Sequence, residues 1–461
     1  MRTTLQRMGL VILMLFAPLM AANAQIKGKI TDASARQFRV AIPDFTVTSP
    51  EAKVYADRIK SIIEDDLNST GLFKLLDEQS FVETQLNISL KPRFGDWRLI
   101  QAENVMVGQL NLTSSGELEF SFRLWDTGTE QQRLFPDENG SLTRRGNQFS
   151  VSQDNLRRLA HVVADNIYTS LTGDIGYFDT RIVFIHESGP KTKRIKRLAI
   201  MDQDGANSEF LTNEKHLVLT PRFSPTAQTI TYMTYESNRP QVYLFDINTG
   251  RSESLGQFDG MTYAPRFSPD GQNVVFTQEI NGNSELYILN LTRRETTRLT
   301  DHPAIDVSPS MSPDGKQIAF TSDRGGRQQI YIMNTDGSAF LCPTTNQVDT
   351  ACRITGFTGG GYYSTPVWSP RGDYIAFTKQ AGGQFYIGVI QPDGRGERLL
   401  TESYLVEAPA WSPNGRVIIF TREARVGDQP KLFTIDLTGR NLRAVKAPGS
   451  ATDPAWSPPL R

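Results

Sequence analysis

Three acidic residues are the strongest candidates for acid–base chemistry in this chain of 461 residues. Asp306, Glu407 and Asp453 each stand a few residues before a recurring Ser-Pro pair, so a repeating fold would bring them near one end of its channel. Two carboxylates that face each other can serve as the acid and the base of a glycosidase. Such acids are more often solvated loop residues or turn formers. The sequence therefore supports a hydrolase acting on sugar or peptide substrates only as an alternative function.

Other catalytic signatures are weak. The sequence contains no Gly-x-Ser-x-Gly nucleophile elbow, and Gly359-Gly360-Gly361 lacks the Lys-Ser/Thr of a phosphate-binding loop. The four histidines have no fixed partner in the pattern; they are His161, His186, His216 and His302. We therefore predict that the protein is not an enzyme and that it needs no cofactor and no metal ion.

The N-terminus resembles a secretory signal peptide. Arg2 and Arg7 precede an apolar stretch over residues 9–20, which ends at the small-residue pattern Ala22-Asn23-Ala24. Residues 1–24 are the predicted signal peptide, and no other apolar run approaches the ~20 residues that a transmembrane helix needs. Loss of two arginines changes the formal charge from -1 to -3, which offers no electrostatic footprint for nucleic acid.

Cys342 and Cys352 are the only cysteines. In an oxidising compartment they are expected to form a disulfide, which would contribute roughly 3 kcal/mol at best for so short a loop. Two unpaired thiols are the alternative. A metal site has little support, because two cysteines without a nearby histidine supply too few ligands.

A short motif recurs six times and marks a repeating unit. An aromatic residue or methionine precedes Ser-Pro in each copy, and β-rich runs broken by Asp-Gly, Gly-Gly and Asn-Gly turns follow, as in antiparallel hairpins. Intervals of 44, 44, 57, 43 and 45 residues separate the serines, which are Ser224, Ser268, Ser312, Ser369, Ser412 and Ser457. A period near 44 fits a four-stranded blade. Residues 176–461 are therefore predicted to form an all-β, six-bladed β-propeller.

The motif also indicates which strand is innermost and how the ring closes. A proline stands three residues before each serine, at Pro221, Pro265, Pro309, Pro366, Pro409 and Pro454. Proline cannot donate to a β-ladder, so this strand should form the blade edge that faces the channel. The first hairpin, over residues 180–202, has no motif strand before it, and the last motif strand, over residues 453–457, has no hairpin after it. We expect them to pair and close the ring.

Residues 25–175 have a different pattern, which predicts an α/β domain. Residues 39–43 read as a strand, and Ser49-Pro50 is a helix start that leads into an apolar face containing Val54. Ser152 is expected to open a last helix that ends near Gly173. The linker should then enter the propeller on the face that carries the Ser-Pro turns, leaving the opposite face open.

The ordered combination of these features resembles the TolB family of the Tol-Pal system of Gram-negative bacteria. The resemblance rests on the leader, the Arg39-to-Phe45 strand, the α/β domain and six blades ending in Pro454-Ala455-Trp456-Ser457-Pro458. It implies a periplasmic, non-enzymatic adaptor that links the outer-membrane lipoprotein Pal to inner-membrane Tol proteins. Such an adaptor supports outer-membrane integrity and invagination during cell division.

The resemblance also implies two binding ends. In that family the N-terminus of the mature protein binds TolA, which points here to Gln25, Ile26 and Ile30 in a short, mostly polar tail. Without the resemblance, a frayed terminus would be the simpler interpretation. The channel mouth of the propeller binds Pal, and other envelope lipoproteins are further possible partners.

The loops that enter the inner strands supply candidate residues for this mouth. Seven residues before the motif serines stand Leu217, Met261, Ile305, Tyr362, Leu405 and Ser450, of which five are apolar. Their predicted neighbours are Tyr263, Tyr363, Tyr404 and Glu407. A ring of this kind suits a protein-binding surface. The same side chains could instead pack between blades, and the periodicity does not separate the two arrangements.

Overall fold

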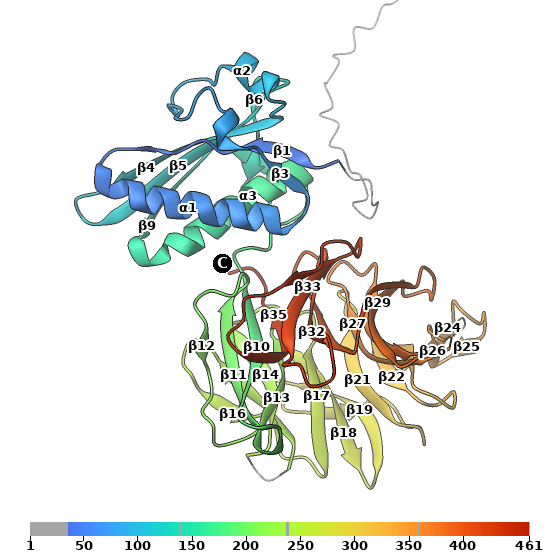
Figure 1. The fold of residues 1–461 in the computed structure, drawn as a ribbon. Helices are drawn as coiled ribbons and strands as arrows, with labels where there is room; N and C mark the ends of the chain where they lie inside the picture. The colour runs from blue at the N-terminus through green and yellow to red at the C-terminus, as the bar shows by residue number, and fades with distance from the viewer. Residues whose placement is uncertain (1–35, 138–139, 145, 237–238, 357–359, 461) are drawn as a thin grey trace, which may run out of the picture.

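The computed structural model describes residues 36–137, 140–144, 146–236, 239–356 and 360–460, and it contains an α/β domain joined to a β-propeller (Figure 1). The predicted signal peptide and the tail residues Gln25, Ile26 and Ile30 lie outside the described residues. No helix in the described ranges has the length and apolar character to span a membrane.

The α/β domain is built on one mixed sheet with the strand order β3-β1-β4-β5-β6, in which β2 also pairs with β4 and β9 with β5. The first three strands of this order run parallel, and β5 is antiparallel to β4. The strands of the domain are β1 Phe38–Ala41, β2 Thr46–Val47, β3 Phe73–Leu75, β4 Asn104–Leu112, β5 Glu117–Asp126, β6 Gln131–Gln132, β7 Phe135–Pro136, β8 Leu142–Arg144 and β9 Asn147–Ser152.

Two long helices, α1 (Pro50–Ser69) and α3 (Leu156–Thr172), lie against one face of this sheet (Figure 1). The Ser49 side chain caps α1 as predicted, since its oxygen accepts from the Ala52 N–H. Val54 was predicted on the apolar face of this helix, but 63% of its surface is exposed, so it does not belong to the core. The short helix α2 (Phe94–Leu99) covers part of the opposite face.

The last helix begins later than predicted. Ser152 does not cap it; a 3₁₀ turn, η2 (Gln153–Asn155), intervenes before α3. Gly173 ends α3 in the left-handed region with φ of 76°, a conformation that glycine adopts without steric cost. Two further 3₁₀ turns are η1 (Glu78–Ser80) and η3 (Lys191–Lys193).

The rest of the described chain forms six four-stranded antiparallel sheets, as the repeat predicted. The inner strands are β35 Ser450–Trp456, β13 Val218–Phe223, β17 Met261–Phe267, β21 Asp306–Met311, β27 Tyr362–Trp368 and β31 Leu405–Trp411. The second strands are β10 Arg181–Ser188, β14 Thr229–Thr234, β18 Asn273–Ile280, β22 Gln317–Ser322, β28 Ile375–Ala381 and β32 Val417–Glu423. The third strands are β11 Ile195–Asp202, β15 Gln241–Asp246, β19 Asn283–Asn290, β23 Gln329–Asn334, β29 Gln384–Ile390 and β33 Lys431–Asp436. The outer strands are β12 Glu209–Phe210, β16 Ser252–Ser254, β20 Thr296–Arg298, β26 Ala351–Arg353, β30 Arg398–Ser403 and β34 Arg443–Ala444.

The C-terminal strand closes the ring. β35 pairs antiparallel with β10, from Ile182 opposite Trp456 to Glu187 opposite Ser450. This pairing supplies the first blade with its inner strand. The edge of β10 is therefore paired rather than left open to aggregation, and β35 forms the edge of the blade that faces the channel.

Every inner strand has a bulge at its proline, which periodicity did not reveal. The residue before each proline has a left-handed backbone with φ between 47° and 56°; these residues are Thr220, Ala264, Ser308, Thr365, Ala408 and Asp453. Such φ values are costly for residues with a side chain, so surrounding contacts must hold them. The N–H of Ser308 donates to Thr277 of the preceding blade at 3.3 Å, and that of Asp453 donates to Thr421 at 3.0 Å. The bulge thus links neighbouring blades at the channel.

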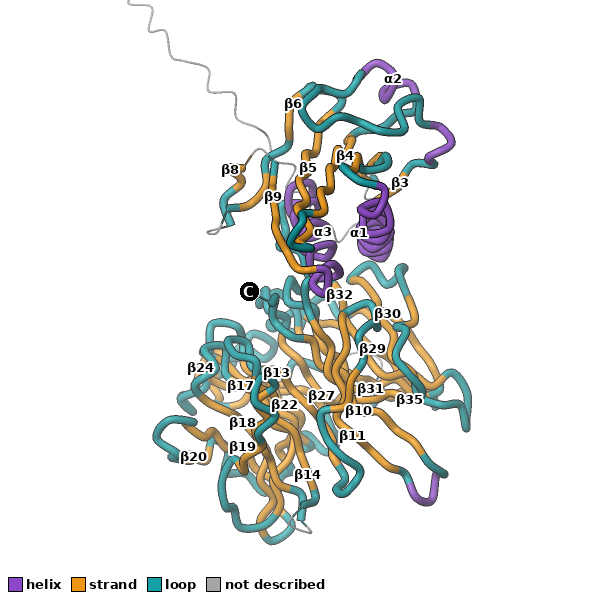
Figure 2. The backbone as a smooth tube through the Cα atoms, turned by 90° about the vertical axis from the view of Figure 1, so that its left-hand side faces the viewer, coloured by secondary structure: helices purple, strands orange, loops and turns teal. Residues whose placement is uncertain are grey.

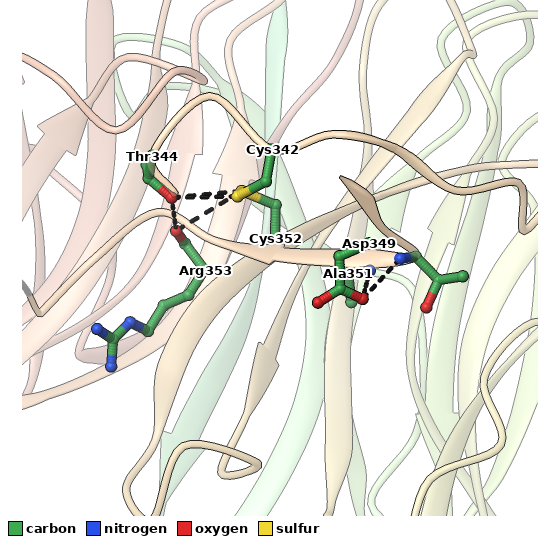
Figure 3. The surroundings of a disulfide bond; sticks show 7 residues. Cys342, Thr344, Asp349, Ala351, Cys352 and Arg353 are labelled. Atoms are coloured by element: carbon green, nitrogen blue, oxygen red, sulfur yellow. Dashed lines mark hydrogen bonds between the residues drawn. A yellow bond between two sulfur atoms is a disulfide. The ribbon is translucent and has the colours of Figure 1, made fainter. Parts of the chain in front are cut away.

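Cys342 and Cys352 are joined in a disulfide within the longest repeat (Figure 3). Both residues are buried, and Cys352 lies in β26, the outer strand of its blade. The bond closes a small hairpin formed by β24 (Phe340–Leu341) and β25 (Val348–Asp349). The Thr344 hydroxyl donates to the carbonyl of Arg353 at 2.8 Å beside the sulfur atoms. The disulfide therefore ties the inserted hairpin to the blade.

The last part of the linker between the domains, over residues 176–180, is buried and packed. The Asp165 carboxylate of α3 accepts the N–H groups of Phe178 and Asp179 at 2.7 and 3.0 Å. Tyr177 packs edge-on against Trp456 of β35, with ring centroids 5.8 Å apart. Seen from the side, the contact between the domains lies beneath α3 and beside the C-terminus (Figure 2). The two domains thus share one core at the junction.

The closure predicts the effect of a truncation. Deleting residues 451–461 removes most of β35 and leaves the edge of β10 unpaired. Thermal denaturation followed by circular dichroism should show that the propeller loses its cooperative transition. Truncation after Ser457 keeps all of β35 and should preserve that transition. A normal melting curve for the longer deletion would rule out closure by this strand.

Candidate functional site

The six inner strands begin on the propeller face that points away from the α/β domain, here called the open face. Their other ends turn at the Ser-Pro motifs, where Arg371 binds the Asp174 carboxylate at 3.0 Å and the Asn414 side chain donates to the carbonyl of Ile175 at 2.9 Å. Asp174 and Ile175 belong to the linker. The motif turns therefore face the α/β domain, as predicted, and the strand starts surround the opposite mouth of the channel.

Apolar side chains from three blades are exposed on the open face. Leu217, Ile305 and Tyr362 expose 37%, 43% and 54% of their surface, and Tyr404 exposes 42%. Met261 and Leu405 are half-buried at the starts of β17 and β31. Exposed aromatic and aliphatic side chains grouped around a mouth are a feature of protein-binding surfaces. Ser450, at the sixth equivalent position, is buried.

Tyr363 does not belong to this exposed set. Its side chain is fully buried, its ring packs against Phe377 at 5.2 Å, and its hydroxyl donates to Glu397 at 2.8 Å. Successive side chains of a strand point to opposite faces, so Tyr362 and Tyr363 lie on different sides of the blade. The prediction that Tyr363 flanks the ring at the surface is wrong. Tyr263 is half-buried, with its hydroxyl 2.9 Å from the Ser284 hydroxyl.

A charged cavity of about 300 Å³ opens beside the ring, between the first and last blades. The residues that line it are Glu187, Arg194, Lys196, Glu407, Glu423, Asp428, Pro430, Thr452 and Asp453. Lys196 binds Glu187 at 2.6 Å, which leaves an excess of carboxylates around the cavity. Of these acids, the sequence pattern pointed to Glu407 and Asp453 but not to Glu187 or Glu423. A usable signal existed, since both stand near the ends of second strands, which reach the open face.

The carboxylates of this cavity raise each other's proton affinity. Burial raises the pKa of Glu407 to about 7, and the negative charge of Asp453 adds to the increase. Burial also raises the pKa of Asp453, while Arg222 and Lys196 oppose that change. A carboxyl group that titrates near neutral pH changes the charge of the open face within the physiological range.

The remaining candidates for acid–base chemistry have structural partners. Asp306 is fully buried and binds Arg324 at 2.6 Å. The His186 ring packs against Phe210 at 5.1 Å, and Nδ1 of His302 accepts the Ala304 N–H at 3.0 Å. These contacts give Asp306, His186 and His302 structural roles that involve no catalysis. The geometry of these residues therefore gives the hydrolase alternative little support.

A polar cluster between the domains was not predicted. Nδ1 of His161, on α3, lies 2.7 Å from an oxygen of Asp66 on α1, and the Gln203 side chain of the first blade donates to the other oxygen at 2.9 Å. Although burial opposes the charged ring, Asp66 raises the pKa of His161 to about 9. The expectation that His161 has no fixed partner is wrong. Its partner Asp66 stands 95 positions away, and Gln203, which holds the other oxygen of Asp66, stands 137 positions from Asp66, so no local pattern could reveal the cluster.

The high pKa of Glu407 predicts how stability changes with pH. The folded protein holds this proton more tightly than the unfolded chain, so the resulting stabilisation is complete below pH 4.5 and is lost as pH rises through about 7. Neutral glutamine avoids the loss. Glu407→Gln should therefore raise the free energy of unfolding by about 1 to 2 kcal/mol at about pH 8 and change it little at about pH 5, allowing for solvent screening.

Urea denaturation at both pH values measures this difference. Glu402→Gln, an exposed glutamate on β30, is the matched control and should change neither value. A Glu407→Gln protein whose stability follows that of the natural sequence at both pH values would show that Glu407 is not protonated in the fold.

Comparisons with known proteins agree with the architecture and identify the family. Residues 27–133 match the family described as TolB amino-terminal domain, and residues 168–460 match the TolB beta propeller domain. The chain is similar to TolB from Acinetobacter baumannii, with 29% identity, a TM-score of 0.76, and coverage of 92% of this chain and 97% of that one.

Two weaker similarities cover less of the chain. A putative TolB from Agrobacterium tumefaciens has 20% identity and a TM-score of 0.46 over 60% of this chain and 93% of that one. An oligogalacturonate lyase from Vibrio parahaemolyticus has 10% identity and a TM-score of 0.36 over 57% of this chain and 85% of that one. Neither carries an argument about function. The two domain matches together span most of the chain in the order seen in the structure, and the chain therefore belongs to the TolB family.

Proposed function

We propose that the protein is a periplasmic adaptor of the Tol-Pal system, which binds the lipoprotein Pal at the open face of its propeller and TolA through its N-terminal tail. In this role it links the outer membrane to inner-membrane Tol proteins and supports outer-membrane integrity and invagination during cell division. Other envelope lipoproteins are further proposed partners. Family membership supports the class of function, and the structure of the open face supports the mode of binding.

The observation that carries the proposal is the exposed apolar set on the open face. Leu217, Ile305 and Tyr362 come from three different blades, and each leaves more than a third of its surface exposed. The α/β domain occupies the opposite face through the linker contacts of Asp174 and Ile175. A partner of protein size therefore has access to the channel mouth from one side only. Exposed aromatic and aliphatic anchors of this kind contribute most of the binding energy at protein interfaces.

The charged cavity adds specificity to this surface. Glu407 and Asp453 lie beside the apolar set, and the pKa of each is raised by burial. Complementary charges on a partner fix its orientation and its rate of association more than its affinity. We infer that the apolar anchors supply affinity and that the cavity selects the partner.

The N-terminal tail is the proposed second binding end. The described chain begins at Arg36 and enters β1 at Phe38, which pairs with β3 on one side and β4 on the other. β3 is the edge strand of the sheet. A polar segment that precedes a sheet can gain order by adding to the sheet of a partner.

The open face predicts different results for two adjacent tyrosines. Tyr362→Ala removes an exposed anchor and should weaken Pal binding by about 1 to 3 kcal/mol while leaving the melting temperature unchanged. Tyr363→Ala removes a buried ring and should lower stability by about 3 to 5 kcal/mol. Leu399→Ala, an exposed leucine on β30 of the same blade, is the control for a general loss of apolar surface.

Isothermal titration with purified Pal and thermal denaturation of each variant measure both quantities. Unchanged Pal affinity in a stable Tyr362→Ala protein would remove this residue from the interface. Equal losses for Tyr362→Ala and Leu399→Ala would show that binding does not select the open face.

Removing the N-terminal tail should affect the binding of one partner and not of the other. Removing residues 25–33 should abolish TolA binding and preserve Pal binding, since the tail precedes the first strand of the folded domain and the Pal surface lies on the propeller. Replacing the same nine positions with a Gly/Ser segment is the control for length and should also abolish TolA binding. Titration of each protein with both partners measures the effect. Retained TolA affinity would place that site elsewhere.

A further inference from the structure

A set of metal-ligating side chains lies between the two domains. His161 belongs to α3 of the α/β domain, while Asp202 ends β11 and Asp204 follows it in the first blade. One ring nitrogen of His161 and one carboxylate oxygen from each aspartate lie within 4.8 Å of one another. One imidazole and two carboxylates are a donor set that Zn²⁺ and related divalent ions bind.

His161 is fixed in an orientation that leaves one nitrogen available. Nδ1 is engaged by Asp66 at 2.7 Å, and Gln203 holds the other oxygen of Asp66 at 2.9 Å. The side chain is only 4% exposed, and its buried Nε2 has no hydrogen-bond partner within the described residues. Buried polar atoms are rarely left without a partner. In a metal-binding histidine, the ring nitrogen that does not bind the metal usually contacts a carboxylate. That contact sets the orientation of the ring and increases the basicity of the imidazole.

The neighbourhood has space for an ion with its water ligands. A cavity of about 280 Å³ is lined by His161, Asp202, Asp179 and Asn207, among other residues of both domains. Asp202 and Asp204 are half-buried, so an ion can reach them from solvent. Oxygen ligands alone would suit Ca²⁺ or Mg²⁺, whereas the imidazole favours a transition ion.

We propose that this cluster binds one divalent transition-metal ion of the zinc class, through Nε2 of His161 and the carboxylates of Asp202 and Asp204. Water completes the coordination, and Asp66 acts as the positioning residue for the imidazole. Because the metal binds the neutral ring, binding releases the proton from Nε2. The ion would connect α3 to the first blade and so act as a clamp between the domains.

Arg157 is the natural competitor for this site. Its Nε lies 3.2 Å from an oxygen of Asp202, and its Nη2 binds Asp204. The guanidinium neutralises the same two carboxylates that a metal ion would use, so the ion must displace it. This competition separates a metal site from a purely structural ion-pair cluster. Removing Arg157 would weaken a structural cluster, whereas it would strengthen metal binding.

The test is calorimetric titration of Zn²⁺ into the untagged mature chain after treatment with a chelator. The natural sequence should bind one ion per chain. Asp204→Asn and Asp66→Asn should each lower the affinity at least about tenfold, as the loss of a ligand or of its orienting carboxylate does. His216→Gln, which changes an exposed histidine, should leave it unaltered. Arg157→Gln should raise it about tenfold or more.

A second measurement keeps the test decisive if a variant disturbs the domain junction. X-ray absorption at the zinc edge of the natural protein should show one imidazole together with oxygen ligands. The proposal is overturned if Zn²⁺ does not saturate at one site, if the absorption spectrum lacks imidazole, or if Arg157→Gln lowers the affinity.

Discussion

The pairing of β35 with β10 is the constraint on which the rest of the molecule depends. It joins residues from opposite ends of the propeller, and the same segment continues into the domain junction. Nε1 of Trp456 donates to the Thr180 hydroxyl at 2.8 Å, and the Arg181 N–H donates to the Ser457 hydroxyl at 2.8 Å. Ring closure and domain docking therefore use one strand. Opening the ring would also remove the surface against which the linker packs, so the two parts of the fold cannot be lost independently at this point.

Much of the architecture was predictable because it follows from local chemistry that repeats. The Ser-Pro turns, the prolines before them and the Ser49-Pro50 helix start act within a few residues, and they fixed the blade period, the inner strand and the start of α1. Side-chain direction was less predictable. Tyr362 and Tyr363 are adjacent in one strand, yet one is exposed and the other buried. The spacing from the motif serine separates the two faces of the inner strand, since the position six residues before the serine is buried in every blade, but the spacing does not indicate which of the two faces is covered.

Contacts between domains could not be predicted from the sequence in any detail. Asp66, His161 and Gln203 come from two helices and a blade, and each reads separately as an ordinary polar residue. Their meeting depends on how α1 and α3 pack and on where the linker enters the propeller. The fold then changes their chemistry, since burial opposes the charged form of His161 and the adjacent Asp66 nevertheless raises the pKa of its ring to about 9. The same reasoning applies to Glu407, whose carboxyl group is unremarkable in the sequence and titrates near pH 7 only because the fold buries it near Asp453.

The placement of β35 also bears on how the two ends of the molecule can communicate. Asp453 lies in the middle of this strand and lines the cavity on the open face, while Trp456 contacts Tyr177 of the linker only three residues later. A partner that fills the cavity therefore contacts the strand that holds the linker. Contact of this kind couples two sites only if the strand or linker has two arrangements that each ligand stabilises differently. The Asp66–His161–Gln203 cluster stabilises one arrangement of the domains at the far end of the same junction. A change at the open face that moved the α/β domain would thus have to break or strain this cluster. The strength of the coupling would therefore depend on the junction rather than on either binding surface.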